Sequence, residues 1–259
     1  MIKYLSALLL ILCYTCLVWG SDTAKLEKLK INLTAQYYPP YINGENNDAF
    51  LTRIVLAAFK LANVEVSQSE VPNNRAISGV TQGLYEGSYG WGYTEERASK
   101  LLYSAKPIFS LRIVFFQRAN ENYSWEKLSD LHSHTVGAVQ GNFYSDEFTR
   151  LQNRGELNVD YAPSDVSNFR KLLTGRVDLL PIDLETGNYI LQKHFRAEER
   201  HKLVAQSKAL SVVPVYVVIN KNLPQAKELM QRFDMGFQQL SDSGQLAKII
   251  ETYKLQQRN

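Results

Sequence analysis

The chain has 259 residues, with 29 Lys+Arg against 26 Asp+Glu and a formal net charge of +3. This length suits one large or two modest globular domains. The near balance of charge argues against a nucleic-acid binder, which needs a concentrated basic face. We therefore expect a soluble globular protein.

The first segment, "MIKYLSALLLILCYTCLVWG", is apolar after Lys3. Its apolar run is short for a membrane span, and Val18-Trp19-Gly20 offers residues that a signal peptidase reads. We expect residues 1–20 to be a cleaved secretory signal, with an uncleaved anchor as the alternative. In a bacterium the product would be periplasmic or secreted. Because Cys13 and Cys16 lie in this segment, we expect no disulfide and no thiolate metal site in the mature chain.

Strands and helices alternate in the first third of the chain. "LKINLTAQYYPPYI" predicts a strand that Pro39-Pro40 ends. "DAFLTRIVLAAFKLA" carries a helical stripe of apolar residues with Asp48 as its candidate N-cap. "VEVSQSEV" predicts a strand, and "NNRAISGVTQG" predicts a short helix that ends at Gly83. This alternation predicts a parallel sheet with helices on both faces.

The same order restarts in the middle of the chain. The predicted elements, alternating from strand to helix, are "HTVGAVQG", "NFYSDEFTRLQNRG", "NVDYAP", "DVSNFRKLLTG", "VDLLPID" and "LETGNYILQKHF". A late strand "PVYVVINKN" and one or two C-terminal helices follow. Two such units, joined by the extended segments "SLRIVFFQRA" and "SVVPVYVVIN", predict two lobes with a cleft between them.

Loops that could meet a ligand follow several of these strands. In open α/β sheets, ligands bind beyond the carboxyl ends of the strands. The loops that we predict at such positions are Tyr37–Tyr41, Tyr89–Arg97, Asn142–Phe143 and Asp183.

Five segments, in order and spacing, resemble the family 3 periplasmic solute-binding proteins, which serve ABC importers of polar amino acids. They are "YYPPYI", "YTEERASKLLYSAKPIF", "LSDLHSHTVGAVQGNFY", "LLTGRVDLLPID" and "FQQLSDSGQLAKIIETY". The resemblance implies an α/β fold of two lobes, each a mostly parallel sheet flanked by helices, with the ligand cleft between them. We expect lobe 1 to comprise residues 21–116 and 214–259, and lobe 2 residues 117–213.

The resemblance also implies roles for single residues. In that family an arginine in a threonine-x-x-arginine turn binds the ligand's α-carboxylate, which here is Arg97. An acid after a second-lobe strand binds the α-ammonium, which here is Asp183. Tyr38 would stack on the ligand, and the glycine turn of lobe 2 would add hydrogen bonds from Asn142 and Phe143.

The chain departs from the family pattern around this predicted pocket. Many members have serines where this chain has Gly90 and Gly92, and a hydroxyl residue where it has Phe143. The pocket would also be more aromatic than is usual in the family, through Tyr89, Trp91 and Tyr93. The resemblance thus implies a small polar or zwitterionic solute and supports an ordinary amino acid less firmly.

The residues alone leave several roles open. The Arg97 guanidinium matches a carboxylate as a bidentate fork, but it could instead pair with Glu95 or Glu96 on a solvated turn. Asp183 follows an apolar strand, so it could cap the next helix, contact a ligand, or do both. Arg75 is a candidate second anion contact, with a surface or interlobe ion pair as its alternative.

Other chemistries find little support in the sequence. His132 and His134 form an H-x-H pair, but no cysteine or third ligand lies near them in the sequence, so we predict no metal site. The glycines lack the ending of a phosphate-binding loop, and there is no G-x-S-x-G nucleophile turn. We predict no cofactor.

The sequence therefore predicts a non-enzymatic, monomeric periplasmic binding protein. It would close by a hinge around one small amino-acid-like carboxylate and present it to a membrane permease complex. One alternative is a periplasmic dehydratase of the cyclohexadienyl type, with Asp183 or Glu185 as its acid. Another is a sensor component that binds a solute without transporting it.

Overall fold

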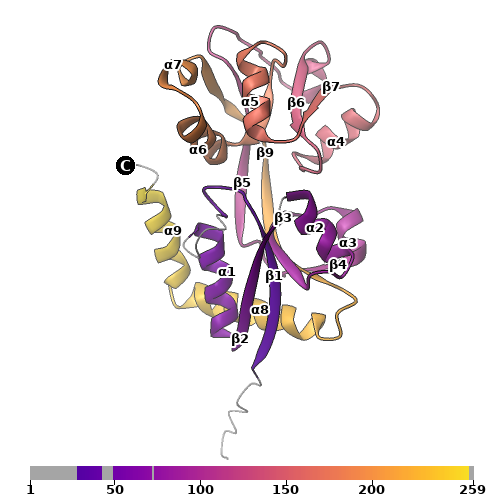
Figure 1. Ribbon diagram of the computed structural model, residues 1–259, viewed down its shortest axis with the longest axis vertical. Helices are drawn as coiled ribbons and strands as arrows, with labels where there is room; N and C mark the ends of the chain where they lie inside the picture. Colours follow the sequence, from indigo (N-terminus) through magenta and orange to yellow (C-terminus); the bar gives the residue numbers. More distant parts are fainter. Residues whose placement is uncertain (1–27, 43–48, 72, 257–259) are drawn as a thin grey trace, which may run out of the picture.

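The computed structural model describes residues 28–42, 49–71 and 73–256. These residues form two lobes, one above the other in Figure 1. The predicted signal peptide, its two cysteines and Asp48 lie outside the described residues. Within the described ranges, no helix is both long enough and apolar enough to cross a membrane.

Lobe 1 is the lower half of Figure 1. Its elements are β1 (Leu29–Gln36), α1 (Phe50–Leu61), β2 (Val64–Val71), α2 (Asn73–Thr81), β3 (Gly87–Gly92), α3 (Glu95–Lys100), β4 (Leu101–Tyr103), α8 (Ala226–Asp242) and α9 (Gln245–Gln256). Strand β1 pairs in parallel with β2 on one side and with β3 on the other. The predicted alternation of strands and helices therefore gives the predicted parallel pairing.

Lobe 2 is the upper half of Figure 1. Its elements are the 3₁₀ helix η1 (Leu128–Leu131), β6 (Thr135–Val139), α4 (Asp146–Asn153), β7 (Asn158–Ala162), α5 (Asp165–Leu173), β8 (Leu180–Asp183), α6 (Leu184–His194) and α7 (Ala197–Arg200). Strands β6 and β7 pair in parallel, and a parallel bridge between Val136 and Leu179 places β6 next to the segment that enters β8.

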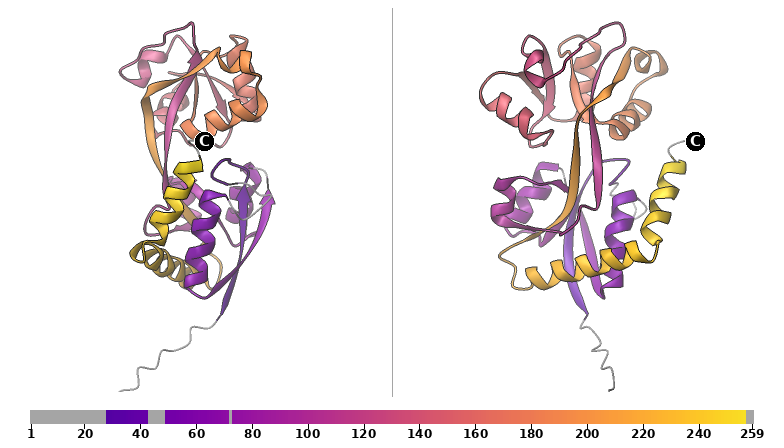
Figure 2. Two further views of the ribbon diagram at one scale, coloured as in Figure 1. Left: turned by 90° about the vertical axis from the view of Figure 1, so that its left-hand side faces the viewer. Right: turned by 180° about the vertical axis from the view of Figure 1, so that it is seen from behind.

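Two long strands connect the lobes. β5 (Phe109–Arg118) and β9 (Leu203–Asn220) pair antiparallel and run side by side from one lobe into the other in both views of Figure 2. β9 pairs with β3 in lobe 1, and β5 pairs with β8 in lobe 2. The predicted two-lobed α/β fold is confirmed. The predicted lobe boundaries fall within β5 and β9, and the exact division stays a prediction.

The predicted loop at Tyr89–Arg97 is wrong. Tyr89 to Gly92 belong to β3, and Arg97 lies in α3. Glycine is a poor strand former, so "GSYGWG" gave no strand pattern in the sequence. The strand forms because β3 lies between β1 and β9 and hydrogen-bonds to both. Tertiary pairing thus overrides local propensity here.

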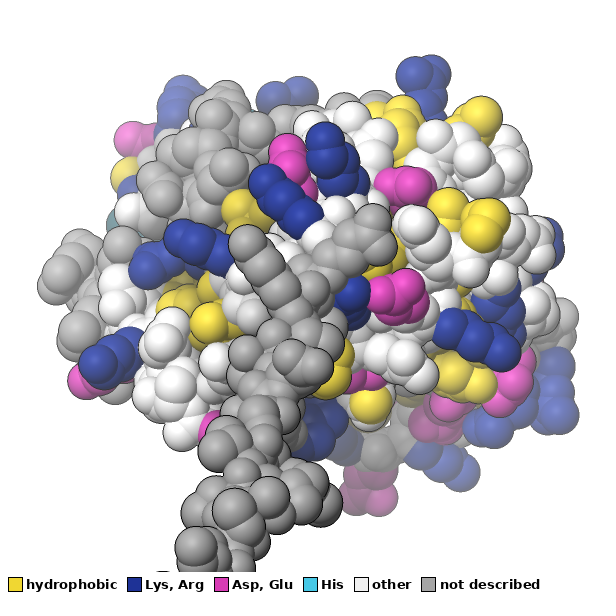
Figure 3. Space-filling model, turned by 90° about the horizontal axis from the view of Figure 1, so that it is seen from below, with side chains coloured by type: hydrophobic (Ala, Val, Ile, Leu, Met, Phe, Trp, Pro, Cys, Tyr) yellow, Lys and Arg dark blue, Asp and Glu magenta, His cyan; other side chains and the backbone are white. Residues whose placement is uncertain are grey.

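The underside of lobe 1 carries charges of both signs. Lys and Arg side chains are interspersed with Asp and Glu side chains on the face shown in Figure 3. An ion pair also joins Lys28, the residue before β1, to Glu65 of β2, with Lys28 Nζ 2.9 Å from Glu65 Oε2. An exposed pair of this kind contributes only about 0–1 kcal/mol to stability. The visible face is therefore mixed in charge.

The core of lobe 1 depends on the close approach of α1 and α8. The apolar stripe of α1 is buried, and Phe59 packs against Phe233 of α8 with ring centroids 5.0 Å apart. Gly236 faces Ala58 of α1, and a Cβ placed at Gly236 would overlap the Ala58 carbonyl oxygen. The two helices can therefore lie this close only because position 236 has no side chain.

We expect Gly236→Ala to destabilise the protein by about 1–3 kcal/mol, because overpacking a close helix contact forces the backbones apart. In an exposed helix alanine is about 1 kcal/mol more favourable than glycine. A loss of stability in Gly236→Ala would therefore be opposite in sign to the effect of helix propensity. The matched control is Ser241→Ala, at an exposed position of the same helix. Urea unfolding of both variants measures the difference, and a Gly236→Ala variant at least as stable as wild type would contradict this packing.

Candidate ligand-binding site

A cavity of about 60 Å³ lies between the lobes. Apolar side chains of the connecting strands form much of its wall. The polar side chains that line it come from both lobes and include Gln36, Tyr38, Arg97, Asn142, Tyr144 and Asp183. Ligand pockets are typically about 300–1,000 Å³. In this closed arrangement there is room for a group of only a few heavy atoms.

Arg97 spans the gap between the lobes. Its backbone N–H bonds to Thr94 Oγ1, the N-cap of α3, at 3.2 Å. Its guanidinium donates to the Gly92 carbonyl of lobe 1 at 3.1 Å and to the Gly141 carbonyl of lobe 2 at 3.2 Å. It also lies over the Trp91 ring, 5.2 Å from the centroid, a cation–π arrangement. Burial lowers the pKa of Arg97, yet a guanidinium remains charged at any working pH.

A bulge in β3 positions Trp91. The register with β9 shifts between Tyr89 and Trp91. Gly90, between them, has φ 81°, a conformation that disfavours side chains. Trp91 is 5% exposed, and its indole N–H donates to Ser88 Oγ at 2.7 Å. Ser88 therefore holds the edge of the indole ring, and the Arg97 guanidinium covers its face.

Phe143 of lobe 2 packs onto Gly92 of lobe 1. A Cβ at Gly92 would lie 3.3 Å from Phe143 Cδ1 and 3.1 Å from Val213 Cγ1. Contacts this short force the neighbour to move. Gly92 and Phe143, two of the departures from the family pattern, are thus complementary to each other across the gap.

Asp183 is 1% exposed and caps the N-terminus of α6. Its Oδ1 accepts from Thr186 N at 3.1 Å and from Thr186 Oγ1 at 3.3 Å. Its Oδ2 accepts from Arg112 N of β5 at 2.9 Å, and the Tyr41 hydroxyl is a further donor to this carboxylate. Burial raises the pKa of Asp183, and the donors partly offset that rise. The predicted helix-cap role is present.

Tyr38 is half-buried at the cavity wall, stacked on Tyr41 with ring centroids 6.1 Å apart. Its hydroxyl hydrogen-bonds to the Thr186 side chain. Since the Thr186 hydroxyl donates to Asp183, its oxygen is left to accept from Tyr38. Burial raises the pKa of Tyr38 well above its usual value.

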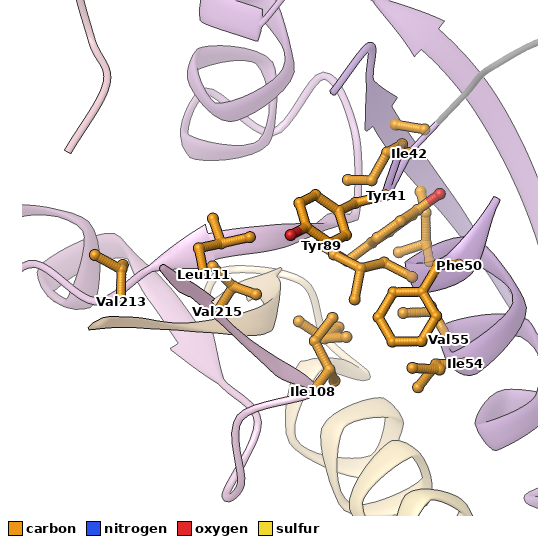
Figure 4. Close-up of a cluster of buried hydrophobic side chains, with 14 of the residues drawn as sticks. Tyr41, Ile42, Phe50, Ile54, Val55, Tyr89, Ile108, Leu111, Val213 and Val215 are labelled. Carbon is orange, nitrogen blue, oxygen red and sulfur yellow. The ribbon is translucent and has the colours of Figure 1, made fainter. Parts of the chain in front are cut away.

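Three predicted contacts do not line the cavity. Tyr89 is fully buried in the core of lobe 1 (Figure 4), and its hydroxyl bonds to Thr52 Oγ1 and Gln68 Oε1, both at 2.9 Å. Burial raises the pKa of Tyr89 to about 12. Tyr93 is exposed and donates to Glu95 Oε1 at 3.2 Å. Arg75 is exposed on α2. The bulge in β3 explains Tyr89. Regular alternation would place Tyr89 and Trp91 on the same face, but the register shift between them leaves Tyr89 on the face opposite the cavity.

The sequence interpretation missed Gln36 and the hydrophobic wall. Gln36 is 5% exposed at the carboxyl end of β1 and is one of the residues that line the cavity. Its Oε1 is buried from solvent and has no hydrogen-bond partner. Its position at a strand end was the available signal. Leu111, Val213 and Val215 link the cavity to the lobe 1 core (Figure 4), and Tyr144 adds a lobe 2 ring.

A larger groove of about 820 Å³ lies on the other side of Arg97. It shares Arg97, Gly141, Asn142 and Phe143 with the cavity between the lobes. These four residues therefore form the partition between the cavity and the groove. Separating Gly141 and Phe143 from Arg97 and Gly92 would join the two spaces.

The histidine pair gives no metal site in the part of the chain that the structure describes. No group of three or more His, Cys, Asp or Glu side chains there is arranged to hold an ion. His132 Nδ1 lies 3.2 Å from the Ser129 carbonyl oxygen, and the His134 ring packs edge-on against Tyr123 with centroids 4.8 Å apart.

Comparison with known proteins places this geometry in context. No protein-family model matches the chain, and no curated protein matches it. Solved structures do. A histidine kinase sensor domain described as similar to periplasmic binding proteins has a TM-score of 0.71 and 18% identity, covering 87% of this chain and 95% of its own. An ancestral arginine-binding protein bound to arginine has a TM-score of 0.70 and 19% identity, and the match covers 86% of this chain and 97% of that one.

The GluR0 ligand-binding core from Nostoc punctiforme in complex with L-glutamate gives a TM-score of 0.69 and 16% identity, covering 86% of this chain and 98% of that one. The similarities extend over nearly the full length of each of these proteins. At such identities they show the architecture, and the chain has the two-lobed periplasmic-binding-protein fold.

Proposed function

We propose that this protein is a solute-binding protein of the periplasm that captures a small carboxylate by closing its two lobes. The carboxylate would bind the guanidinium of Arg97, and Asn142 and Phe143 would close over it from lobe 2. A cleaved signal over residues 1–20 would export the chain. The bound form would be presented to the membrane permease of an ABC importer.

The observation that carries this proposal is the position of Arg97. The guanidinium lines a cavity between the lobes and donates to a carbonyl of each lobe. These two bonds use two of its five N–H donors, and the Tyr103 hydroxyl is a further partner. The remaining donors are available for an anion. A charged acceptor forms stronger hydrogen bonds with a guanidinium than carbonyls do.

A sensor role is the second candidate, because a histidine kinase sensor domain is among the similar structures. The same closure would then be read by a signalling partner rather than by a permease. Structural neighbours named as ligand-binding proteins favour binding over catalysis. For a dehydratase, Asp183 is already committed to four donors, and Glu185 does not line the cavity.

We expect a panel of small carboxylates, amino acids and polyamines to contain a compound that raises the melting temperature. A ligand at 100 times its Kd adds about 2.7 kcal/mol to stability. Arg97→Ala should then weaken its binding by about 2–5 kcal/mol, or roughly thirty-fold to a few thousand-fold. Arg97→Lys should recover only part of this, because lysine lacks the planar fork.

Calorimetric titration measures these affinities, and Arg170→Ala on the exposed surface of α5 is the matched loss of one positive charge. Equal affinity in Arg97→Ala and wild type would contradict the proposal. So would a panel in which no carboxylate binds.

Closure itself can be tested at the contact between Gly92 and Phe143. We expect Gly92→Ser to weaken ligand binding, because its Cβ would press on Phe143 and Val213 in the closed form. The double variant Gly92→Ser/Phe143→Ser should bind more tightly than Gly92→Ser alone, since the smaller residue at 143 relieves that contact. Small-angle scattering with and without ligand would report closure, and strictly additive losses in the two single variants would argue against a direct contact.

A further inference from the structure

The cavity offers no carboxylate with spare acceptor capacity among its described lining residues. Asp183 is the acid that lines it. An ionised carboxylate has about four lone-pair sites on its two oxygens. Four donors already occupy this one, namely Thr186 N, Thr186 Oγ1, Arg112 N and the Tyr41 hydroxyl. An ammonium group in the cavity would have to displace one of them.

The charge of Asp183 is partly compensated within the protein. The carboxylate caps the eleven-residue helix α6, where the helix dipole favours a negative charge. Two of its donors are backbone N–H groups, which cannot turn away. The Tyr38 hydroxyl is engaged with Thr186 in the same network. These contacts hold Asp183 as a helix cap and offset part of the cost of burying its charge.

The unmet polar group of this cavity is a neutral one. Gln36 lines the cavity, and its buried Oε1 has no hydrogen-bond donor. An unpaired buried acceptor costs free energy. A ligand that donates a hydrogen bond to this oxygen removes that cost, and its binding becomes more favourable by the same amount. An amide oxygen accepts from a hydroxyl as readily as from N–H, but it gives an ammonium no compensating charge.

We propose that the ligand is a short hydroxycarboxylate, with its carboxylate on Arg97 and its hydroxyl donating to Gln36 Oε1, rather than an α-amino acid. This rests on the proposed function and narrows its ligand class. The size of the cavity, about 60 Å³, agrees with a ligand of few heavy atoms. Gly90 lies next to Gln36, since a Cβ at Gly90 would lie 3.7 Å from Gln36 Nε2, an ordinary contact distance.

One other carboxylate lies near this region. Asp165, the first residue of α5, interacts electrostatically with Tyr38 and Tyr144, and its Oδ1 is buried without a partner. It does not line the cavity. If a ligand ammonium reached it, amino acids would bind after all, and Asp165→Asn would abolish that binding. The experiment below includes this variant.

The test compares ligands that differ at one position only. Wild-type protein is titrated with three series, namely acetate, glycolate and glycine; propionate, lactate and alanine; and succinate, malate and aspartate. In the series that binds, we expect the hydroxy acid to bind at least tenfold more tightly than either the deoxy acid or the amino acid. Thermal shift and calorimetry both report this ranking.

Two variants of Gln36 separate a ligand contact from a structural role. Gln36→Glu would supply a negative acceptor at the same place, so the preference should move at least tenfold from the hydroxy acid toward the amino acid. Gln36→Leu should bring the hydroxy acid and the deoxy acid to equal affinity. A residue that acts only on folding would weaken all three ligands alike, and that result would overturn the assignment of Gln36.

The outcomes also separate this inference from the proposed function. If the amino acid binds most tightly in wild type and loses affinity in Arg97→Ala, the inference fails while the carboxylate-binding function stands. Loss of that binding in Asp165→Asn would then identify Asp165 as the ammonium partner. If no compound in the three series binds but another carboxylate of the wider panel does, the inference fails and the proposed function stands. If no carboxylate binds at all, both fail.

Discussion

The arrangement of the site depends on one guanidinium that is bonded to both lobes. Arg97 donates to the Gly92 carbonyl on its own side and to the Gly141 carbonyl on the other. Hydrogen bonds that involve one charged group contribute about 1.5–3 kcal/mol. A bond of this strength can favour the closed form without making it permanent. Opening the hinge breaks the bond from Arg97 to Gly141, and with it the bonds that Tyr38 and Tyr41 of lobe 1 make to lobe 2. Gly92 and Trp91 meanwhile keep the cation oriented.

The aromatic residues around Arg97 can take their positions only because glycines lie next to them. Gly90 allows the bulge that turns Trp91 under the guanidinium, and Gly92 provides the space that Phe143 occupies. In this chain the cleft is therefore closed by ring and backbone contacts, where many members of the family that the sequence resembles have hydroxyl side chains. Hydrocarbon in place of hydroxyl groups removes hydrogen-bonding groups from the cavity wall. The orientation of a ligand would then depend on Gln36, Arg97 and the backbone.

The sequence predicted the architecture well because alternation and order are local properties. The apolar stripe of α1 and the strands β1, β2 and β6 to β8 follow from periodicity alone. The site was harder to predict. Arg97 and Asp183 could be placed at strand ends, but whether Asp183 had spare acceptor sites depended on Tyr41 and Arg112, which are distant in sequence. Tyr89 was misassigned for the same reason, since only the pairing of β3 decides which face it occupies.

The bonding of Asp183 assigns it a mechanical role beside any ligand. Its Oδ2 accepts from Arg112 N in β5, and Ile113, the next residue, is paired with Asp183 in the β5–β8 ladder. The β5–β9 register shifts immediately after Ile113, and these two strands connect the lobes (Figure 2). Irregular pairing makes a strand easier to bend. Asp183 thus fastens the start of α6 to the connecting strand next to its irregular point, so a movement of lobe 2 about this point carries α6 with it.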